Sequence, residues 1–301
     1  MPFYFKKGDL VSTKCDALVA ASNVNLKMVE GVSRAIFHKA GDKELTNACK
    51  AIGHCDVGHS VMTPSFNLKT CNAIIHTVGP IYINGKHNEE KNLRKAYLSA
   101  LKICVDNNFK TVAFPLLSGE FNYPLRECYE VAEDEIRNFL KDHKDFKIYM
   151  VIFKNYPETT DETTHDKLEK YIYNNYDNST ISKDIASENT AFIKMVKDIQ
   201  KVKNINDEDL AFNSNLALED LNKYFNDKTL IPSKNIVYSI ACGLKATTDE
   251  LLHLLNVVGY RTYKNDLTGL IVSFAFTEGI YDPIKINSYL FAYDTTEPLG
   301  L

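Results

Sequence analysis

The sequence predicts an α/β domain with a mostly parallel central sheet covered on both faces, followed by an all-α domain. In the first half, short apolar runs alternate with longer amphipathic stretches that have helical spacing. Neighbouring parallel strands need such crossover helices between them. A polar, turn-rich stretch then begins at Asn155, and from Asn189 onward the pattern is almost wholly helical. These observations together favour two domains of different class.

The elements of the first domain follow one another in a regular order. The most distinct helix is expected at 89–108, where an apolar stripe runs from Leu93 to Cys104 at helical spacing. Apolar runs closed by Gly, Pro or Asn are typical of buried strands. Strands are expected within 11–23, 57–62, 72–80 and 147–153, and a strand followed by a loop is expected within 111–124. Helices are expected at 32–51, 89–108 and 125–143.

The domain boundaries follow from a change in composition. One further helix at 165–176 is assigned to the first domain, and "DNSTISKDIAS" reads as a linker. We therefore predict a first domain at 1–176, a linker at 177–188 and a helical domain at 189–301. Within the last of these, Ser233 and Thr247 are expected N-caps, and Gly259 is an expected C-cap.

The bulk composition excludes several classes of protein. The 301 residues are 45% hydrophobic and 25% charged, which is ordinary for a globular protein. No apolar run is long enough to cross a membrane, and the N-terminus lacks a signal-peptide core, so a cytoplasmic location is expected. Seven dispersed cysteines without a CxxC pair favour reduced thiols over disulfides or a metal site. The net charge of −4 disfavours a nucleic-acid binder, and no cofactor is expected.

Polar residues and glycines gather where three of the expected strands end. Ser22-Asn23, Ser118-Gly119 and Lys154-Asn155 each follow an apolar run. In a parallel α/β sheet such ends lie along one rim, where ligands bind. Backbone N–H groups in glycine loops and at helix N-termini favour anions without basic side chains. A phosphate-binding cleft is one interpretation, and ordinary turn chemistry is the other.

Four stretches follow one another in the first part of the chain: "GDLVSTKCDALVAASN", "VEGVSRAIFHKAG", "IIHTVGP" and "PLLSGEFNYP". Through them, residues 1 to about 176 resemble the macrodomain family, whose members have a three-layer α/β/α fold and bind ADP-ribose. The four stretches resemble the family's opening strand, its first phosphate loop and helix, its central strand and its second phosphate loop. The resemblance implies the three-layer fold and an ADP-ribose cleft along the rim.

The resemblance also implies individual roles. Asp9 would accept a hydrogen bond from the adenine amine, the Leu10 backbone would contact the ring edge, and Phe153 would pack against the base. Asn23 would contact the distal ribose. Simpler alternatives remain: Asp9 as a turn cap, Asn23 as a loop cap and Phe153 as a core residue. The implied phosphate loops comprise Gly31 and Val32 on one side and Ser118, Gly119, Glu120 and Phe121 on the other, with Phe121 beside the distal ribose.

Several departures from the family pattern bear on catalysis. Val29 and Glu30 stand where the family has loop glycines, and Ser33 stands where many active hydrolases carry an aspartate. Serine cannot supply a carboxylate to activate water. Catalysis would then rest on water held by the substrate's phosphates and placed by Asn23, or on Glu30 as a replacement base. The histidines lack ligand spacing, so no metal is assigned.

The helical tail resembles a domain that follows the macrodomain in some bacterial proteins, and part of it resembles a repressor-type helix-turn-helix. Residues 216–223 would then form the recognition helix. Glu219 and Asp220 lie there, in a tail with 11 Lys and Arg against 14 Asp and Glu. Such charges oppose DNA phosphates, so a protein partner or the chain's own macrodomain is favoured over DNA.

The functional expectation is an ADP-ribose-binding macrodomain protein. It would hydrolyse mono-ADP-ribosyl esters or O-acetyl-ADP-ribose, with ADP-ribose or an ADP-ribosylated macromolecule as its partner. The alternatives are a catalytically silent reader and a nucleotide sensor that acts through the helical domain.

Overall fold

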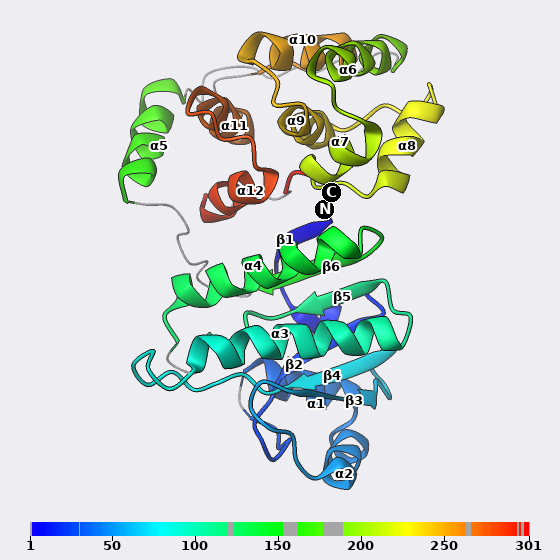
Figure 1. Cartoon of the computed structure of the whole chain (residues 1–301), viewed down its shortest axis with the longest axis vertical. Helices are drawn as coiled ribbons and strands as arrows, with labels where there is room; N and C mark the ends of the chain where they lie inside the picture. Colours follow the sequence, from blue (N-terminus) through cyan, green and yellow to red (C-terminus); the bar gives the residue numbers. More distant parts are fainter. Residues whose placement is uncertain are drawn as a thin grey trace. The chain divides into compact units, whose positions relative to one another are not determined.

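The computed structural model describes residues 2–29, 31–119, 123–152, 162–176, 189–262, 266–293, 295 and 298–300. The chain forms two compact units (Figure 1). One comprises Phe5–Pro157, and the other comprises Met1–Tyr4 together with Glu158–Leu301. The linker predicted at 177–188 lies outside the described residues.

The first unit is built around a six-stranded sheet of order β1-β6-β5-β2-β4-β3. Strand β2 is parallel to both β4 and β5, β5 is parallel to β6, and β3 is antiparallel to β4. The prediction of a mostly parallel sheet is confirmed. The carboxyl ends of β6, β5, β2 and β4 therefore share one rim. The strands are β1 (Phe3–Lys7), β2 (Ala17–Ala21), β3 (Ser60–Pro64), β4 (Ala73–Thr77), β5 (Thr111–Phe114) and β6 (Lys147–Ile152).

Helices cover both faces of this sheet. Successive strand residues point to opposite faces. Ala113 of β5 belongs to the same buried cluster as Ile36, which lies in the helix Val32–Ala40. The ring of the next residue, Phe114, instead lies 5.5 Å from that of Tyr97, in the helix Glu89–Asp106. The sheet thus lies between two helical layers, which confirms the three-layer prediction. The helices are α1 (Val32–Ala40), α2 (Asp42–Ile52), α3 (Glu89–Asp106) and α4 (Leu125–Asp142), and a 3₁₀ turn, η1, spans Leu10–Ser12.

The single helix predicted at 32–51 is wrong, because Gly41 divides it into α1 and α2. Gly41 has φ of 105°, a conformation open to glycine but costly for other residues. Its N–H donates to the Phe37 carbonyl at 2.9 Å and closes α1. Helical spacing continues on both sides of the break, which is why periodicity alone did not reveal it.

The described part of the second unit is helical from Glu162 onward. Ser233 and Thr247 accept backbone N–H groups as N-caps, Thr247 within a capping box, and Gly259 closes its helix with φ of 91°. These three predictions are confirmed. The helices are α5 (Glu162–Asn175), α6 (Thr190–Lys203), α7 (Asp207–Asn213), α8 (Leu218–Asn226), α9 (Lys234–Gly243), α10 (Thr248–Val258), α11 (Leu267–Thr277) and α12 (Pro283–Ala292).

Two segments from elsewhere in the sequence belong to this helical unit. Leu168 of α5 lies in one buried core with Phe192 and Val196 of α6, whereas the sequence assigns that helix to the first domain. At the other end of the chain, the Phe3 N–H donates to Asn215 Oδ1 at 3.0 Å. Asn215 Nδ2 donates to the Phe3 carbonyl at 2.8 Å. The amide thus pairs with both backbone groups of one residue, as a strand would.

Candidate functional site

Asp9 lies at the β6 end of the rim. The Gly8 N–H donates to the Ile152 carbonyl at 3.2 Å and holds the turn beside that strand. Asp9 Oδ1 accepts the Val11 N–H at 3.1 Å, and Oδ2 accepts the Ser12 hydroxyl at 3.3 Å. Asp9 is therefore a turn cap in this structure. Each carboxylate oxygen keeps a further lone pair, so its exposed edge can still accept an amine.

Asn23, which follows β2, holds its own loop together. Its Oδ1 accepts the N–H groups of Asn25 and Lys27, both at 3.1 Å, and its Nδ2 donates to the Lys27 carbonyl at 2.8 Å. Both lone pairs of the amide oxygen are used, and one N–H of the amide remains. The loop-cap role is therefore present. A ligand would meet a donor here rather than an acceptor.

A buried histidine of β4 contacts the residue that follows β2. His76 of β4 is 1% exposed. Its Nδ1 lies 3.4 Å from the Ser22 hydroxyl, and its Nε2 lies 3.0 Å from the Thr63 hydroxyl. Ser22 donates to the Ala20 carbonyl at 3.3 Å. A neutral ring protonated on Nδ1 satisfies this pattern, since Ser22 then accepts and Thr63 donates. Sequence reasoning assigned His76 a structural role without locating this network.

Burial lowers the pKa of His76 from 6.5 to about 4. The unfolded chain therefore binds more protons than the folded chain between those two pH values. We expect the free energy of unfolding to fall by up to about 3 kcal/mol as the pH drops from about 6.5 to about 4, with this contribution fully present above that window. Urea unfolding followed by circular dichroism at several pH values measures the slope.

We expect His76→Gln to flatten the pH dependence between about 6.5 and about 4. Equal slopes for wild type and His76→Gln would contradict the assignment to His76.

The loop predicted to hold phosphate on one side ends at Gly31, the N-cap of α1. Gly31 has φ of 77° and ψ of −135°, a region essentially restricted to glycine. Val32 follows as the first helical residue, where backbone N–H groups point out of the helix. The Ser33 hydroxyl accepts the Val29 N–H at 3.3 Å. Ser33 thus stabilises the loop through this hydrogen bond. The resemblance implies a carboxylate at this position in many active hydrolases.

Ser118 lies buried in the loop that follows β5, which is the second loop predicted to hold phosphate. Ser118 has φ of 65° and is 1% exposed, and its hydroxyl has no hydrogen-bond partner among the described residues. Behind it, the Leu117 N–H donates to the Tyr97 hydroxyl at 3.1 Å. The Gly119 N–H donates to the Leu116 carbonyl at 3.2 Å, so it is engaged within its own turn.

Gly79, which follows β4, lies against this serine. A methyl group placed on Gly79 would come within 2.3 Å of the Ser118 hydroxyl oxygen. Sequence reasoning recognised the Gly-Pro that closes β4 but not this contact. The structure therefore brings the ends of β5 and β4 together at one point of the rim. Of the predicted site residues, Glu30, Glu120, Phe121 and Phe153 lie outside the described residues.

In the described part of the chain, neither the cysteines nor metal-ligating side chains form a reactive centre away from the rim. No group of three or more His, Cys, Asp and Glu side chains is placed to hold a metal ion there. Burial raises the pKa of Cys49 to about 11 and of Cys104 to about 12. Such thiols stay protonated and unreactive near neutral pH. Among the described helices, none has the length and apolar character to cross a membrane.

The segment predicted as a DNA-recognition helix overlaps α8, which begins at Leu218. Lys223 Nζ lies 2.7 Å from Asp220 Oδ1 and 3.7 Å from Glu219 Oε1. The lysine charge is thus balanced by carboxylates on the same helix. These ion pairs weaken the case for phosphate contacts here.

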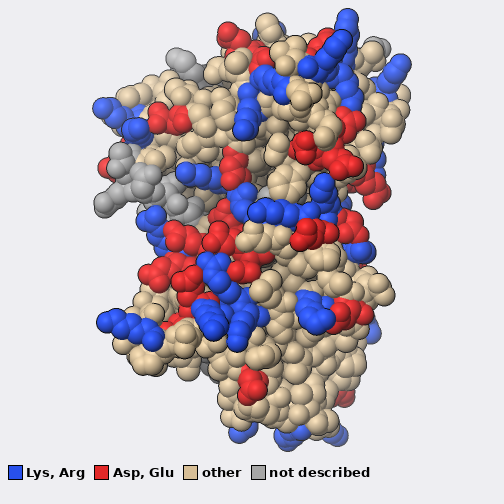
Figure 2. All heavy atoms as spheres, viewed as in Figure 1, with Lys and Arg blue, Asp and Glu red and all other residues tan. Residues whose placement is uncertain are grey.

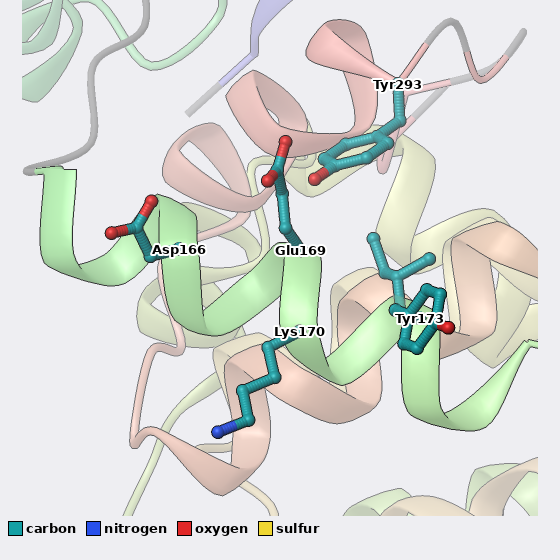
Figure 3. A pocket seen from close by; sticks show the side chains of 6 residues that line it. Asp166, Glu169, Lys170, Tyr173 and Tyr293 are labelled. Carbon is teal, nitrogen blue, oxygen red and sulfur yellow. The ribbon is translucent and has the colours of Figure 1, made fainter.

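A hollow of about 650 Å³ also lies beside α5. Figure 3 shows that Asp166, Glu169 and Lys170 point in different directions from α5. A ligand site needs polar groups that converge. This hollow therefore does not compete with the rim as the candidate site.

The chain is similar to several known proteins. The Macro domain family model matches residues 19–132. A protein of Escherichia fergusonii named O-acetyl-ADP-ribose deacetylase is 37% identical over 153 residues, which cover 49% of this chain and 85% of that protein. A protein of the same name from Salmonella gallinarum is 40% identical over 139 residues, covering 44% and 76% of the two chains. A solved Oceanobacillus iheyensis macrodomain with ADP aligns with a TM-score of 0.49 and 28% identity, over 55% of this chain and 91% of that one.

The fold defines a class of three-layer α/β/α domains with a mostly parallel central sheet. Identity above one third across most of the length of the Escherichia protein specifies the family within that class. The chain belongs to the macrodomain family.

Proposed function

We propose that this chain binds ADP-ribose along the rim and hydrolyses O-acetyl-ADP-ribose or mono-ADP-ribosyl esters. The observation that carries the proposal is the Ser118 hydroxyl, a buried polar group without a partner among the described residues. Buried polar groups are normally hydrogen-bonded, so an unpaired one at a rim is suited to a ligand. The relatives named O-acetyl-ADP-ribose deacetylase support the same substrate class.

The proposed ligand runs along the rim from β6 toward β4. Asp9 and the Leu10 backbone would contact adenine together with Phe153. The N-terminus of α1, with Gly31 and Val32, would hold the pyrophosphate, since helix N-termini favour anions. On the opposite side, the proposed contacts are Ser118, Gly119, Glu120 and Phe121, with Asn23 at the distal ribose.

The proposed reaction is hydrolysis of an ester on the distal ribose. Water would attack the ester carbonyl carbon, the bond to the ribose oxygen would break, and the proton would pass to that oxygen. The free N–H of Asn23 would orient the ribose or the water. Glu30 is the second candidate, as a general base. With Ser33 in place of a carboxylate, we expect slow turnover.

A silent reader is the alternative, and one observation favours it. The Ser33 hydroxyl is engaged by the Val29 N–H, so it serves the loop rather than a water molecule. Binding and turnover are therefore separate questions at this site.

Two measurements separate these functions. Calorimetric titration with ADP-ribose should give micromolar binding that ADP does not reproduce. Acetate release from O-acetyl-ADP-ribose then distinguishes hydrolase from reader. Binding with turnover supports the hydrolase, and binding without turnover supports the reader. Absence of ADP-ribose binding by the folded protein would overturn both.

Ser118→Ala tests the carrying observation directly. We expect ADP-ribose affinity to fall about tenfold, because one hydrogen bond to a charged group is lost. Removing an unpaired buried hydroxyl should leave the free energy of unfolding unchanged or slightly higher. Calorimetry and urea unfolding measure the two effects. A stability loss without an affinity loss would contradict a ligand-binding role for Ser118.

For the helical unit we propose a protein partner rather than DNA. The acidic balance of the tail and the paired Lys223 support this choice.

A further inference from the structure

The loop between β4 and α3 is folded tightly around one buried carboxylate. Glu89 is 2% exposed. Its Oε1 accepts the N–H groups of Ile83 at 3.3 Å, Asn84 at 3.3 Å and Gly85 at 3.2 Å. Its Oε2 accepts the His87 N–H at 2.5 Å. Four backbone donors on one side chain fix the path of residues 83–87 before any ligand binds.

This fixed loop presents two large apolar side chains to water. Ile81 is 65% exposed and Ile83 is 66% exposed. Between them, the Tyr82 ring lies 4.8 Å from that of Tyr123, a residue of the second phosphate loop. The tyrosine therefore ties the loop to the site while the isoleucines point elsewhere. A pre-ordered apolar surface loses little conformational entropy on binding.

The strand order places this loop beyond one end of the proposed ligand. Along the rim the strands run β6, β5, β2, β4. On the proposed function, on which this inference rests, adenine lies at β6 and the distal ribose at β2. Whatever is esterified to that ribose then points toward β4, which leads into residues 80–88. The contact between Gly79 and Ser118 joins this loop directly to the phosphate site.

Basic side chains continue the surface past the isoleucines. A shallow hollow of about 650 Å³ is lined by four basic residues (Lys86, Lys91, Arg94 and Lys95) and by two acidic ones (Glu90 and Glu135). Within the described residues these lysines have no ion pair, whereas Arg94 beside them is held by Glu90 at 2.9 Å. Figure 2 shows basic and acidic side chains gathered over α3 and α4. The available lysines favour an acidic partner.

We infer that residues 80–88, with Lys91 and Lys95, form a docking surface for the polypeptide of a mono-ADP-ribosylated protein. Ile81 and Ile83 would contact apolar side chains next to the modified residue, and the lysines would face acidic ones. Exposed isoleucines favour a protein partner over a nucleic acid, because the charged backbone of a nucleic acid offers few apolar contacts. The chain would thus act on modified proteins more efficiently than on free O-acetyl-ADP-ribose.

The test compares two ligands for the full chain. One is free ADP-ribose, and the other is a protein that carries mono-ADP-ribose esterified to glutamate side chains. Their affinities are measured by competition against labelled ADP-ribose, with O-acetyl-ADP-ribose turnover as a second readout. The variant is Ile81→Ser with Ile83→Ser. Ile52→Ser, which removes a partly exposed isoleucine of α2, is the matched control.

We expect the double variant to bind the modified protein about tenfold more weakly and free ADP-ribose equally well. Adding Lys91→Glu should lower the affinity for the modified protein further at low salt. Ile52→Ser should change neither the affinity for the modified protein nor that for free ADP-ribose. Equal affinity of wild type and double variant for the modified protein would overturn the docking surface. Failure of wild type to bind free ADP-ribose would instead overturn the proposed function.

Discussion

Gly31→Ala is expected to weaken ADP-ribose binding about 100-fold. At φ of 77° and ψ of −135°, a Cβ is strained, so the backbone should rotate to relieve it. That rotation redirects the N–H groups of Gly31 and Val32 away from the proposed pyrophosphate. Two hydrogen bonds to a charged group, lost together, correspond to this factor. Calorimetric titration measures the affinity.

The same substitution should lower the free energy of unfolding by about 1–3 kcal/mol. Gly279→Ala is the matched control, since Gly279 has φ of 71° and a methyl group placed on it would have no neighbour within 4 Å. It places a methyl group on another glycine of positive φ, in the other unit. We expect it to leave ADP-ribose affinity intact. A Gly31→Ala protein that binds ADP-ribose like wild type would remove this loop from the phosphate site.

Asn215→Ala should destabilise the helical unit by about 2–4 kcal/mol. The substitution removes both hydrogen bonds to Phe3, whose backbone is buried. Each buried group left without that partner costs about 1–3 kcal/mol. Because the chain has no tryptophan, unfolding is followed by far-ultraviolet circular dichroism in urea. Two units can unfold separately, so each transition is fitted on its own.

Asn204→Ala provides the control for this prediction. Asn204 closes α6 with φ of 54°, close to the 56° of Asn215, but it is exposed. It shares the left-handed backbone and lacks the buried partners. We expect a loss below about 1 kcal/mol. A loss equal to that of Asn215→Ala would mean that backbone conformation, not the contact with Phe3, governs stability here.

Local patterns predicted much of the fold. The apolar stripe that starts at Leu93 gave α3 almost to its ends, and cap chemistry placed Ser233, Thr247 and Gly259 correctly. These signals lie within one helix or its cap, so tertiary context was not needed. Strand β1 was not predicted. Its stability depends on neighbours far along the chain, which a local pattern does not record.

The candidate site was predicted only in outline. Motif order placed Asn23, Gly31 and Ser118 on one rim, but not their hydrogen bonds. The Asn23 amide closes a five-residue loop, and Ser33 accepts a backbone N–H four residues earlier. Both roles follow from loop conformation rather than residue type. The contact between Gly79 and Ser118 joins two strand ends, so the sequence could suggest the residues but not their contact.

The pairing of Phe3 with Asn215 has a consequence for how the protein can be divided. The two residues are 212 positions apart, yet they belong to one unit. During synthesis Phe3 leaves the ribosome long before Asn215. Residues 2–4 therefore lack this partner until nearly three quarters of the chain has been made. Cutting the gene at codon 158 would yield a helical fragment without its first four residues. Adding those residues back as a short peptide should restore the fragment's stability.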